Sequence, residues 1–403
     1  MNGFEPMPVA ARFPVTMSNH SVSCVVRAPR EAVYRACSAP AELVRWRFPL
    51  DMTARLLADD GAGYRMTLGY EDGHVDTFDS TFVARVPNER VVERIRFDAP
   101  ERAGEMTVTT ALRDVGDGTE VTMQFENLPA NIKPEDNEEG TRQALVRLAE
   151  LVEVRTNIDR KLGEIERTFG VEIFYACESG SRAWDFASPD SDYDVRFLYR
   201  HPRDWYLSLS EQRDVIETPI EGVYDVNGWD LRKALRLALN GNPVLFEWLS
   251  SPVRYLERPL AEGFRDMAFS VFDPVKAYRH YLSMARGQRQ TYLMGEMVRQ
   301  KKYFYAVRPL LACRYLLAER NVVPMRLFDL VDAVVPPAEV HEALVELLRA
   351  KRTASEAAEA QRLPVLDRWI EQSLEALEAR APDSVAPANR APLEQFFRSA
   401  IGA

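Results

Sequence analysis

Two aspartates separated by one residue, Asp192 and Asp194, follow a Gly180–Ser181 pair with ten residues between the two pairs. Apolar runs with the composition of strands flank this segment, Val171–Cys177 before it and Val195–Tyr199 after it. Side chains at i and i+2 of a strand point to the same face, so the two carboxylates lie side by side. The spacing therefore predicts a strand, a tight glycine turn and a second strand that begins with adjacent acidic side chains.

This pair of carboxylates needs a counter-charge, because neighbouring carboxylates remain ionised together only when a positive charge lies between them. Hard divalent cations, which prefer oxygen ligands, supply such a charge. The backbone N–H groups of the glycine turn and the Ser181 hydroxyl suit a phosphate group. A phosphate donor beside carboxylate-held metal ions is the arrangement that nucleotidyl transfer requires.

The same motif resembles the DNA polymerase β nucleotidyltransferase superfamily. The chain is also similar to a bacterial branch of that superfamily, the predicted nucleotidyltransferases of an RNA repair pathway, over residues 160–380. The blocks that carry this second resemblance are Gly180–Trp184, Ser191–Arg196, Gly228–Lys233, Glu247–Pro252 and Lys302–Pro309. The resemblance implies an enzyme that moves a nucleoside monophosphate from a nucleoside triphosphate to an acceptor hydroxyl and releases pyrophosphate.

The resemblance also implies a role for each residue of the motif. Asp192 and Asp194 are expected to be catalytic residues because they bind two Mg²⁺ ions, with Mn²⁺ as the alternative. Gly180 and Ser181 are expected to hold the β- and γ-phosphates, and Arg182 is included in the same nucleotide-binding site. The implied acceptor is an RNA end, and a small molecule is the alternative acceptor.

A third carboxylate, on a later strand, is required by the superfamily. Two candidates lie in the stretch Gly222–Asp230. Asp225 falls in its alternating apolar part, where a strand would present it, whereas Asp230 precedes a run of helical period and is more simply an N-cap. We therefore prefer Asp225 as the carboxylate that binds the second metal ion and helps to activate the attacking hydroxyl, with Asp230 as the alternative.

Positive charge is concentrated in one segment. The net charge of −10 disfavours unspecific binding to nucleic acid, yet residues 276–326 hold eleven Lys or Arg and two acids. On a helix, Lys301, Tyr305 and Arg308 share one face, and Lys302 lies on the next stripe. One interpretation is a cationic wall toward the triphosphate or a polynucleotide end, which makes Lys302 and Arg308 nucleotide-binding residues. The other is a basic helix surface that pairs with acids elsewhere in the chain.

The chain before residue 155 has a different pattern. A strand and a short helix precede several strands separated by turns, and a long helix with one apolar face follows. In order, the predicted elements cover residues 22–27, 29–37, 53–57, 63–70, 75–86, 90–97, 105–113, 119–126 and 137–154.

This order of elements resembles the START-like helix-grip (SRPBCC) fold. The sequence is similar to that of domains related to the Hsp90 ATPase activator at Ala28–Tyr34, Ser38–Leu43, Trp46 and Gly118–Thr122. Such domains enclose an apolar cavity between sheet and helix, so the resemblance implies an apolar small-molecule ligand. The alternative is a packed interaction domain without a ligand.

The chain is therefore predicted to be α+β, with a helix-grip domain, an α/β nucleotidyltransferase domain and a helical region. The predicted boundaries are an N-terminal extension at 1–17, the helix-grip domain at 18–155, the catalytic domain at 160–265, the helical region at 266–382 and a flexible tail at 383–403. A polar helical stretch at 153–166 joins the domains and predicts that the long helix continues into the second one. Residues 393–401 are amphipathic and are expected to dock back onto the body.

Composition narrows the remaining function classes. No run of 18 apolar residues and no secretory signal are evident, so we expect no membrane partner and a cytoplasmic location. The four cysteines are scattered, which is typical of reduced thiols rather than of a zinc site. The alternative function is a ligand-sensing or conflict-system protein, whose first domain binds an apolar ligand or partner and whose transferase modifies a small molecule or a protein.

Overall fold

The chain was analysed as a computed structural model, which describes residues 15–18, 21–48, 52–70, 73–99, 104–129, 132–188, 191–353, 359–380, 382 and 389–402. The chain divides into two compact units, Met1–Arg160 and Lys161–Ala403, and each is described by itself. Among the described residues, no helix combines the length and the apolar character needed to cross a lipid bilayer.

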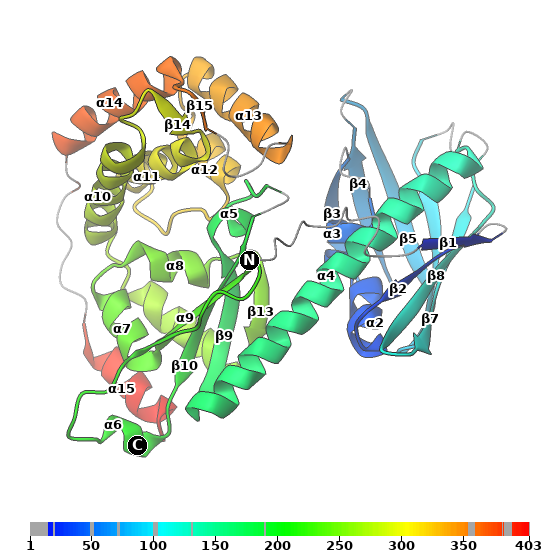
Figure 1. Cartoon of the computed structure of the whole chain (residues 1–403), viewed down its shortest axis with the longest axis horizontal. Helices are drawn as coiled ribbons and strands as arrows, with labels where there is room; N and C mark the ends of the chain where they lie inside the picture. The colour runs from blue at the N-terminus through cyan, green and yellow to red at the C-terminus, as the bar shows by residue number, and fades with distance from the viewer. Residues whose placement is uncertain are drawn as a thin grey trace, which may run out of the picture. The chain divides into compact units, whose positions relative to one another are not determined.

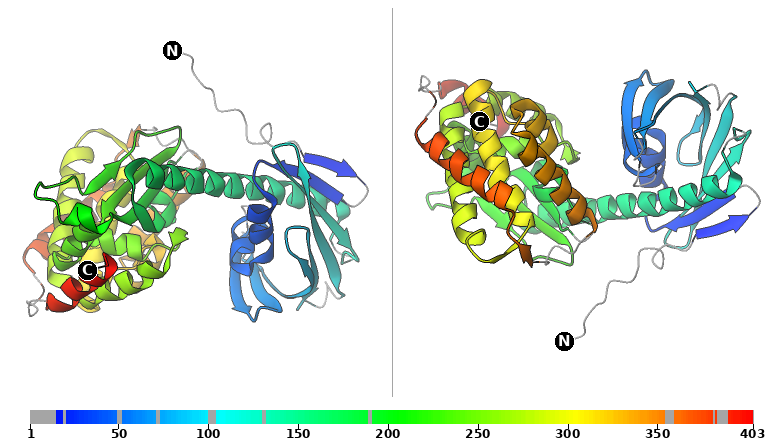
Figure 2. Two further views of the ribbon diagram at one scale, coloured as in Figure 1. Left: turned by 90° about the horizontal axis from the view of Figure 1, so that it is seen from below. Right: turned by 90° about the horizontal axis from the view of Figure 1, so that it is seen from above.

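An antiparallel sheet forms the first unit, with the strand order β1-β2-β8-β7-β6-β5-β4-β3. Both views of Figure 2 show that this sheet, blue to cyan, is strongly curved. Its strands are β1 (Val15–Ser18), β2 (Ser21–Val26), β3 (Thr53–Asp59), β4 (Gly63–Gly69), β5 (Val75–Val86), β6 (Arg90–Phe97), β7 (Met106–Val115) and β8 (Gly118–Glu126). The strands predicted from the sequence are confirmed, with ends that shift by a few residues.

Three helices complete the core of this unit: α2 (Arg30–Ser38), α3 (Pro40–Trp46) and α4 (Pro134–Phe169). Residues along β2 alternate between buried and half-buried, because a strand with one face on a core has a period of two. The apolar face of α4 packs into the same core through Leu145, Leu148 and Val152, as its spacing predicts. The unit is thus a helix-grip fold with one hydrophobic core.

Aromatic rings fill much of the interior of this unit. Phe78 lies at its centre, with ring centroids 6.1 Å from Phe48, 6.1 Å from Tyr64 and 5.6 Å from Phe97. Two small pockets of the unit measure about 20 and 10 Å³, space for a water molecule rather than for an organic ligand. The apolar ligand implied by the family resemblance therefore stays a prediction.

Helix α4 covers both the predicted long helix at 137–154 and the polar stretch at 153–166, so the predicted continuation of the helix is confirmed. The boundary between the two compact units falls inside it, after Arg160. Its last turns belong to the second unit, where Arg258 Nη1 donates to Glu166 Oε1 at 2.6 Å and Lys161 pairs with Glu221.

A five-stranded mixed sheet is the centre of the second unit, with the order β11-β12-β10-β9-β13 (Figure 1). Strands β10 and β12 are parallel, and the other neighbours are antiparallel. The strands are β9 (Glu172–Ser179), β10 (Tyr193–Arg200), β11 (Val215–Glu217), β12 (Tyr224–Asp230) and β13 (Arg254–Glu257). The helices of this part are α5 (Gly180–Ala183), α6 (Arg203–Tyr206), α7 (Leu231–Leu239), α8 (Pro243–Leu249), α9 (Pro259–Ser270) and α15 (Ala391–Ala400).

A helical region, yellow to orange in Figure 1, follows the sheet in the chain. It contains α10 (Pro274–Tyr292), α11 (Lys301–Ala318), α12 (Leu327–Val334), α13 (Ala338–Thr353), α14 (Pro364–Glu378) and a ribbon of β14 (Met297–Arg299) with β15 (Glu359–Gln361). Helix α11 is its central element, because residues from all around this helix are buried, among them Tyr303, Val307 and Leu311.

The ends of the chain are described in part. Residues 1–14 of the predicted N-terminal extension and 383–388 of the predicted flexible tail lie outside the described residues. The amphipathic end forms α15, which packs on α7 and α9 with Leu393 buried, and Arg200 donates to the carbonyl oxygen of Ala400. Docking of residues 393–401 is thus confirmed, and the tail predicted to be flexible up to residue 403 is folded in this part.

Candidate active site

The glycine turn and the aspartate strand meet at one end of the sheet. Strand β9 leads into α5, and β10 returns antiparallel to β9, so that Asp194 is paired with Ser179. Gly180 follows directly with a φ of +64°, a conformation that favours glycine. A Cβ atom on Gly180 would lie 2.1 Å from Asp194 Oδ2. The glycine is therefore required both by the turn and by the carboxylate that packs on it.

Two of the three predicted catalytic carboxylates are brought together by strand register. Asp194 on β10 pairs with Asp225 on the neighbouring parallel strand β12, so both side chains lie on one face of the sheet. Asp192 lies two residues before Asp194, directly ahead of β10. The Arg196 guanidinium links the pair: its Nη2 donates to Asp194 Oδ1 at 3.0 Å and to Asp225 Oδ2 at 2.7 Å.

Arg196 was not among the predicted site residues. It continues the alternation of Asp192 and Asp194 along the strand, and this spacing is the signal that could have placed it on the same face. Its Nη1 also donates to the carbonyl oxygen of Asp225 at 2.8 Å, and Asn227 Nδ2 donates to Asp225 Oδ1 at 2.6 Å. These contacts fix the Asp225 carboxylate against the neighbouring strand.

Asp230 has the capping role that the sequence predicts. Its Oδ1 accepts the Arg232 N–H at 2.8 Å as the N-cap of α7, and its Oδ2 accepts the Tyr206 hydroxyl at 2.6 Å. The residue is fully buried. Burial raises the pKa of the Asp230 carboxyl, although the hydrogen bonds from Tyr206 and the Arg232 N–H act in the opposite direction. Both of its oxygens are used within the fold.

A buried glutamate on β9, Glu178, holds the backbone of the strand that carries Asp194. Glu178 Oε1 accepts the backbone N–H of Asp194 at 2.9 Å, and its Oε2 accepts the Tyr255 hydroxyl. The Glu178 carbonyl oxygen accepts the Ser251 hydroxyl at 2.7 Å. Desolvation raises the pKa of the Glu178 carboxyl to about 7. The sequence analysis missed this residue, although an acid directly after the apolar run Ile173–Cys177 is an available signal.

The two residues after Gly180 are both close to the aspartate strand. Ser181 is buried in the turn. Arg182 Nε donates to the carbonyl oxygen of Asp192 at 3.1 Å, its Nη2 donates to that of Ser191 at 2.6 Å, and its guanidinium lies 3.9 Å from the Tyr193 ring centroid. Arg182 therefore holds the segment that carries Asp192, whereas its predicted nucleotide contact stays a prediction.

The predicted nucleotide-binding residue Arg308 is placed differently from expectation. Its side chain is 2% exposed, and its Nη1 donates to Glu247 Oε1 at 2.6 Å inside the core. Burial thus makes Arg308 part of the fold rather than of a surface wall. The reason is that α11 has no broad solvent face, so a face defined by spacing alone points into the protein.

Lys302, on the first turn of α11, lies nearer to the surface. Its Nζ is 4.0 Å from the Tyr292 ring centroid and 5.0 Å from that of Tyr305. The Tyr305 ring contacts Trp184, just after α5, with centroids 5.4 Å apart. Aromatic contacts therefore connect Lys302 to the turn that carries Gly180.

Elsewhere in the basic segment, two cations pair with acids of α14. Arg286 pairs with Glu378 at 2.6 Å, and Arg289 pairs with Glu371. For these residues the structure agrees with the alternative of a basic helix surface paired within the chain.

The donor set at the sheet end suits a hard divalent cation, because Asp192, Asp194 and Asp225 offer only oxygen ligands. As the side chains stand, no group of three His, Cys, Asp or Glu among the described residues is arranged to hold a metal ion. The Arg196 guanidinium provides the positive charge between Asp194 and Asp225. Arg196 thus occupies Asp194 Oδ1 and Asp225 Oδ2, which a cation bound between the two carboxylates would compete for.

Two family models match the chain. The model of the RNA repair pathway DNA polymerase beta family (RlaP) matches residues 154–399. The model of activator of Hsp90 ATPase homolog 1-like protein matches residues 27–153. The two matches follow one another along the chain, in the order that the sequence predicts.

Individual proteins are similar to one part or the other. Uncharacterized protein YcgL of Bacillus subtilis (strain 168) is 43% identical over 223 residues, which are 55% of this chain and 86% of that protein. A crystal structure from Chromobacterium violaceum is 32% identical, covers 33% of this chain and 95% of its own, and has a TM-score of 0.32. One from Mycobacterium smegmatis is 16% identical, covers 34% and 96%, and has a TM-score of 0.28.

The first family model spans more than half of the chain, including the whole Gly-Ser turn and all three candidate carboxylates. The chain therefore belongs to the RNA repair pathway DNA polymerase beta family and is an enzyme of the nucleotidyltransferase type.

Proposed function

We propose that this protein transfers a nucleoside monophosphate from a nucleoside triphosphate to a hydroxyl of an RNA end, with release of pyrophosphate. The observation that carries the proposal is the register that puts Asp194 beside Asp225, with Gly180 packed on the Asp194 carboxylate. Family membership supports the nucleotide substrate. The RNA acceptor is the family-level expectation that the experiments below test.

In this proposal Asp192, Asp194 and Asp225 hold two Mg²⁺ ions, or Mn²⁺. Bound metal ions would stabilise the attacking and leaving oxygens of an in-line displacement. The Gly180–Ser181 turn holds the β- and γ-phosphates through backbone N–H groups and a hydroxyl. Lys302, which contacts Tyr305 and through it Trp184 after the turn, adds positive charge.

The chemistry is a substitution at the α-phosphorus. The acceptor oxygen forms a bond to this phosphorus while the bond to the bridging oxygen breaks, and pyrophosphate leaves with the electron pair. Asp225 orients the acceptor hydroxyl and helps to draw off its proton. Glu178 acts as a positioning residue, because it holds the Asp194 backbone through the N–H group.

The direct test is to incubate the full chain with each of four α-³²P-labelled triphosphates, Mg²⁺ or Mn²⁺, and total RNA. We expect label in RNA with the wild type and none with Asp194→Asn. Parallel reactions with a small-molecule extract and with protein identify the alternative acceptors. Label in either of those and none in RNA would contradict the proposed acceptor while retaining the transferase.

A further inference from the structure

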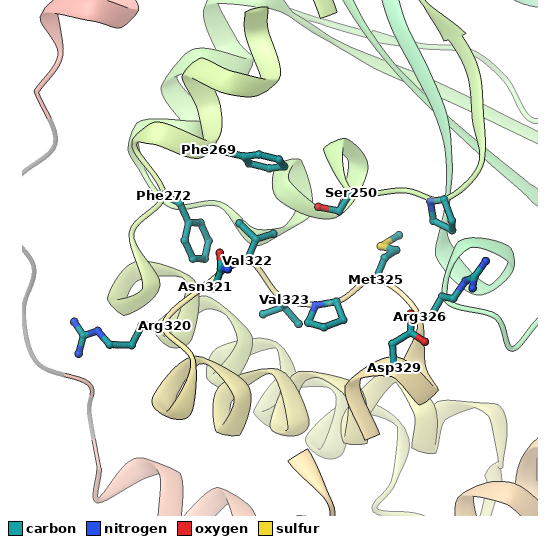
Figure 3. Close-up of a pocket in the computed structure, with 12 residues that line it drawn as sticks. Ser250, Phe269, Phe272, Arg320, Asn321, Val322, Val323, Met325, Arg326 and Asp329 are labelled. Carbon is teal, nitrogen blue, oxygen red and sulfur yellow. Dashed lines mark hydrogen bonds between the residues drawn. The ribbon is translucent and has the colours of Figure 1, made fainter. Parts of the chain in front are cut away.

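A pocket of about 780 Å³ lies in the second unit, a volume typical of ligand-binding pockets. Its walls come from three segments: residues 250–252 after α8, residues 269–272 at the end of α9, and residues 320–329, which follow α11 and include the first turn of α12 (Figure 3). The pocket is open to solvent along one side, so we refer to it as the groove.

The lining of the groove is apolar in its middle and cationic at its ends. Phe269 and Phe272 are half-buried on one wall, and Met325 is buried in the opposite wall. Figure 3 shows Arg320 at one end and Arg326 at the other, with both side chains directed outward from the middle of the groove, and both residues are exposed. Two arginines flanking aromatic rings favour an elongated anionic ligand with flat, stackable groups.

Both rims of the groove are hydrogen-bonded to the strand and turn of the candidate active site. On one rim, Ser251 Oγ donates to the Glu178 carbonyl oxygen at 2.7 Å, and the Glu178 N–H donates to the Val253 carbonyl oxygen at 2.9 Å. On the other, the Leu327 N–H donates to the Trp184 carbonyl oxygen at 3.0 Å. The two rims are therefore attached to β9 and to the residue that follows α5, the elements on either side of the Gly180 turn.

Arg308 shapes this groove from inside the core. Its Nη2 donates to the carbonyl oxygens of Pro324 and Met325, at 3.3 and 3.2 Å, while its Nη1 pairs with Glu247. The wall segment is thereby fastened to α8. Arg308 is a positioning residue for the groove, although it was predicted to contact the nucleotide itself.

We propose that the groove binds the terminal segment of a single-stranded RNA acceptor. Aromatic side chains that stack on bases, together with cations that contact the backbone phosphates, are the features that bind single-stranded nucleic acid. Phe269 and Phe272 supply the rings, and Arg320 and Arg326 supply the charges. Asp329 is the one acid in the lining, so the balance of charge favours a polyanion. The inference rests on the proposed function, because an acceptor site is meaningful only for a transferase.

The test measures binding of a 5′-fluorescein single-stranded oligoribonucleotide to the full chain by anisotropy, over a series of salt concentrations. Phe269→Leu is expected to raise the Kd about tenfold, within the range for loss of one base stack. Arg326→Gln is expected to lower the slope of log Kd against log salt by about 0.7, as for one lost phosphate contact on a single strand.

Two matched variants serve as controls. Phe169→Leu changes an exposed ring at the end of α4, and Arg349→Gln changes an exposed cation on α13, both outside the groove. Both are expected to bind RNA as the wild type does. Thermal unfolding of every variant shows whether a changed Kd reflects a damaged fold.

Three results would overturn the inference: no binding of RNA by the wild type at low salt, equal affinities of the groove variants and the controls, or equally tight binding of a polyglutamate peptide. Asp194→Asn separates this inference from the proposed function, because it is expected to bind RNA normally and to transfer nothing. Groove-dependent binding without any transfer to RNA supports the groove and contradicts the proposed function, so the two can fail separately.

Discussion

Two arginines of the second unit make ion pairs of similar geometry in very different surroundings. Arg196 at the sheet end is 16% exposed, and its partners Asp194 and Asp225 are 30% and 24% exposed. Arg308 on α11 and Glu247 on α8 are 2% and 4% exposed. Water and ions can therefore reach the first site, whereas the second is closed.

The surroundings decide what each pair can do. Both members of the buried pair have further contacts. Glu247 Oε1 also accepts the Tyr281 hydroxyl at 2.7 Å, and the Arg308 guanidinium lies 4.7 Å from the Trp184 ring centroid. A buried pair of this kind is costly to break, because one charge is left without compensation. Under the proposed function, a divalent cation would take the place of Arg196 between Asp194 and Asp225 at the sheet end. We therefore call the sheet end the exchangeable site and the Arg308–Glu247 pair the permanent site.

The largest effect is expected from the exchangeable site. Asp194→Asn and Asp225→Asn keep the shape of the side chain but remove the charge that a cation needs, so turnover should fall at least ~10⁴-fold, roughly 5.5 kcal/mol. Label transfer measures the turnover, and circular dichroism checks the fold. Wild-type turnover in either variant would show that the active site lies elsewhere.

Substitution at the permanent site should lower the stability of the protein. Arg308→Met leaves Glu247 buried without a counter-charge and is expected to cost about 3–5 kcal/mol in the free energy of unfolding. Arg286→Met is the matched control, because Arg286 and Glu378 form an exposed pair that contributes about 0–1 kcal/mol. Urea denaturation compares the two variants. Similar losses in both would mean that burial does not distinguish the pairs.

Metal dependence sharpens the comparison further. Arg196→Gln leaves Asp194 and Asp225 facing each other, so its Tm in EDTA should lie below that of the wild type. Mg²⁺ should then raise its Tm more than it raises that of the wild type, by on the order of 2 kcal/mol of added stability at saturating metal. Arg308→Met should gain no more from Mg²⁺ than the wild type does. If Mg²⁺ stabilises all three proteins equally, Arg196 does not lie where a cation binds.

The smallest effect on turnover is expected at the alternative third carboxylate. Asp230→Asn should leave turnover within about threefold of the wild type. It should lower the free energy of unfolding by about 1–2 kcal/mol, because asparagine still caps the helix but its single oxygen cannot also accept the buried Tyr206 hydroxyl. Asp225→Asn is the internal comparison. Should Asp230→Asn abolish transfer while Asp225→Asn is active, the catalytic role would move to Asp230.

Local patterns were enough to predict the strand, turn and strand of the site. A period of two with a Gly-Ser turn identified β9 and β10, and helical spacing after Asp230 identified the N-cap of α7. The alternation that places Asp225 on a strand is local as well, and β12 contains it. These features depend on residues within about ten positions of each other.

The residues that the sequence analysis misplaced or missed have interaction partners far away in the chain. Arg308 meets a residue 61 positions earlier in the chain, and Glu178 meets a tyrosine 77 positions later. Helical spacing gave the correct face of α11 for Arg308, but only tertiary packing decides whether such a face meets solvent or core. For the same reason the sequence indicated the chemistry of the site but not the groove, whose walls come from three separate segments.

Gly180 offers a way to sort related genes without any assay. A side chain at this position would collide with Asp194. Glycine is therefore the only residue that fits there while the Asp194 carboxylate keeps its position. A homologue that carries alanine or serine at the matching position is therefore expected to have abandoned catalysis, even if its aspartates persist. The residue at this single position therefore separates homologues expected to be active from homologues expected to be inactive in a survey of genomes.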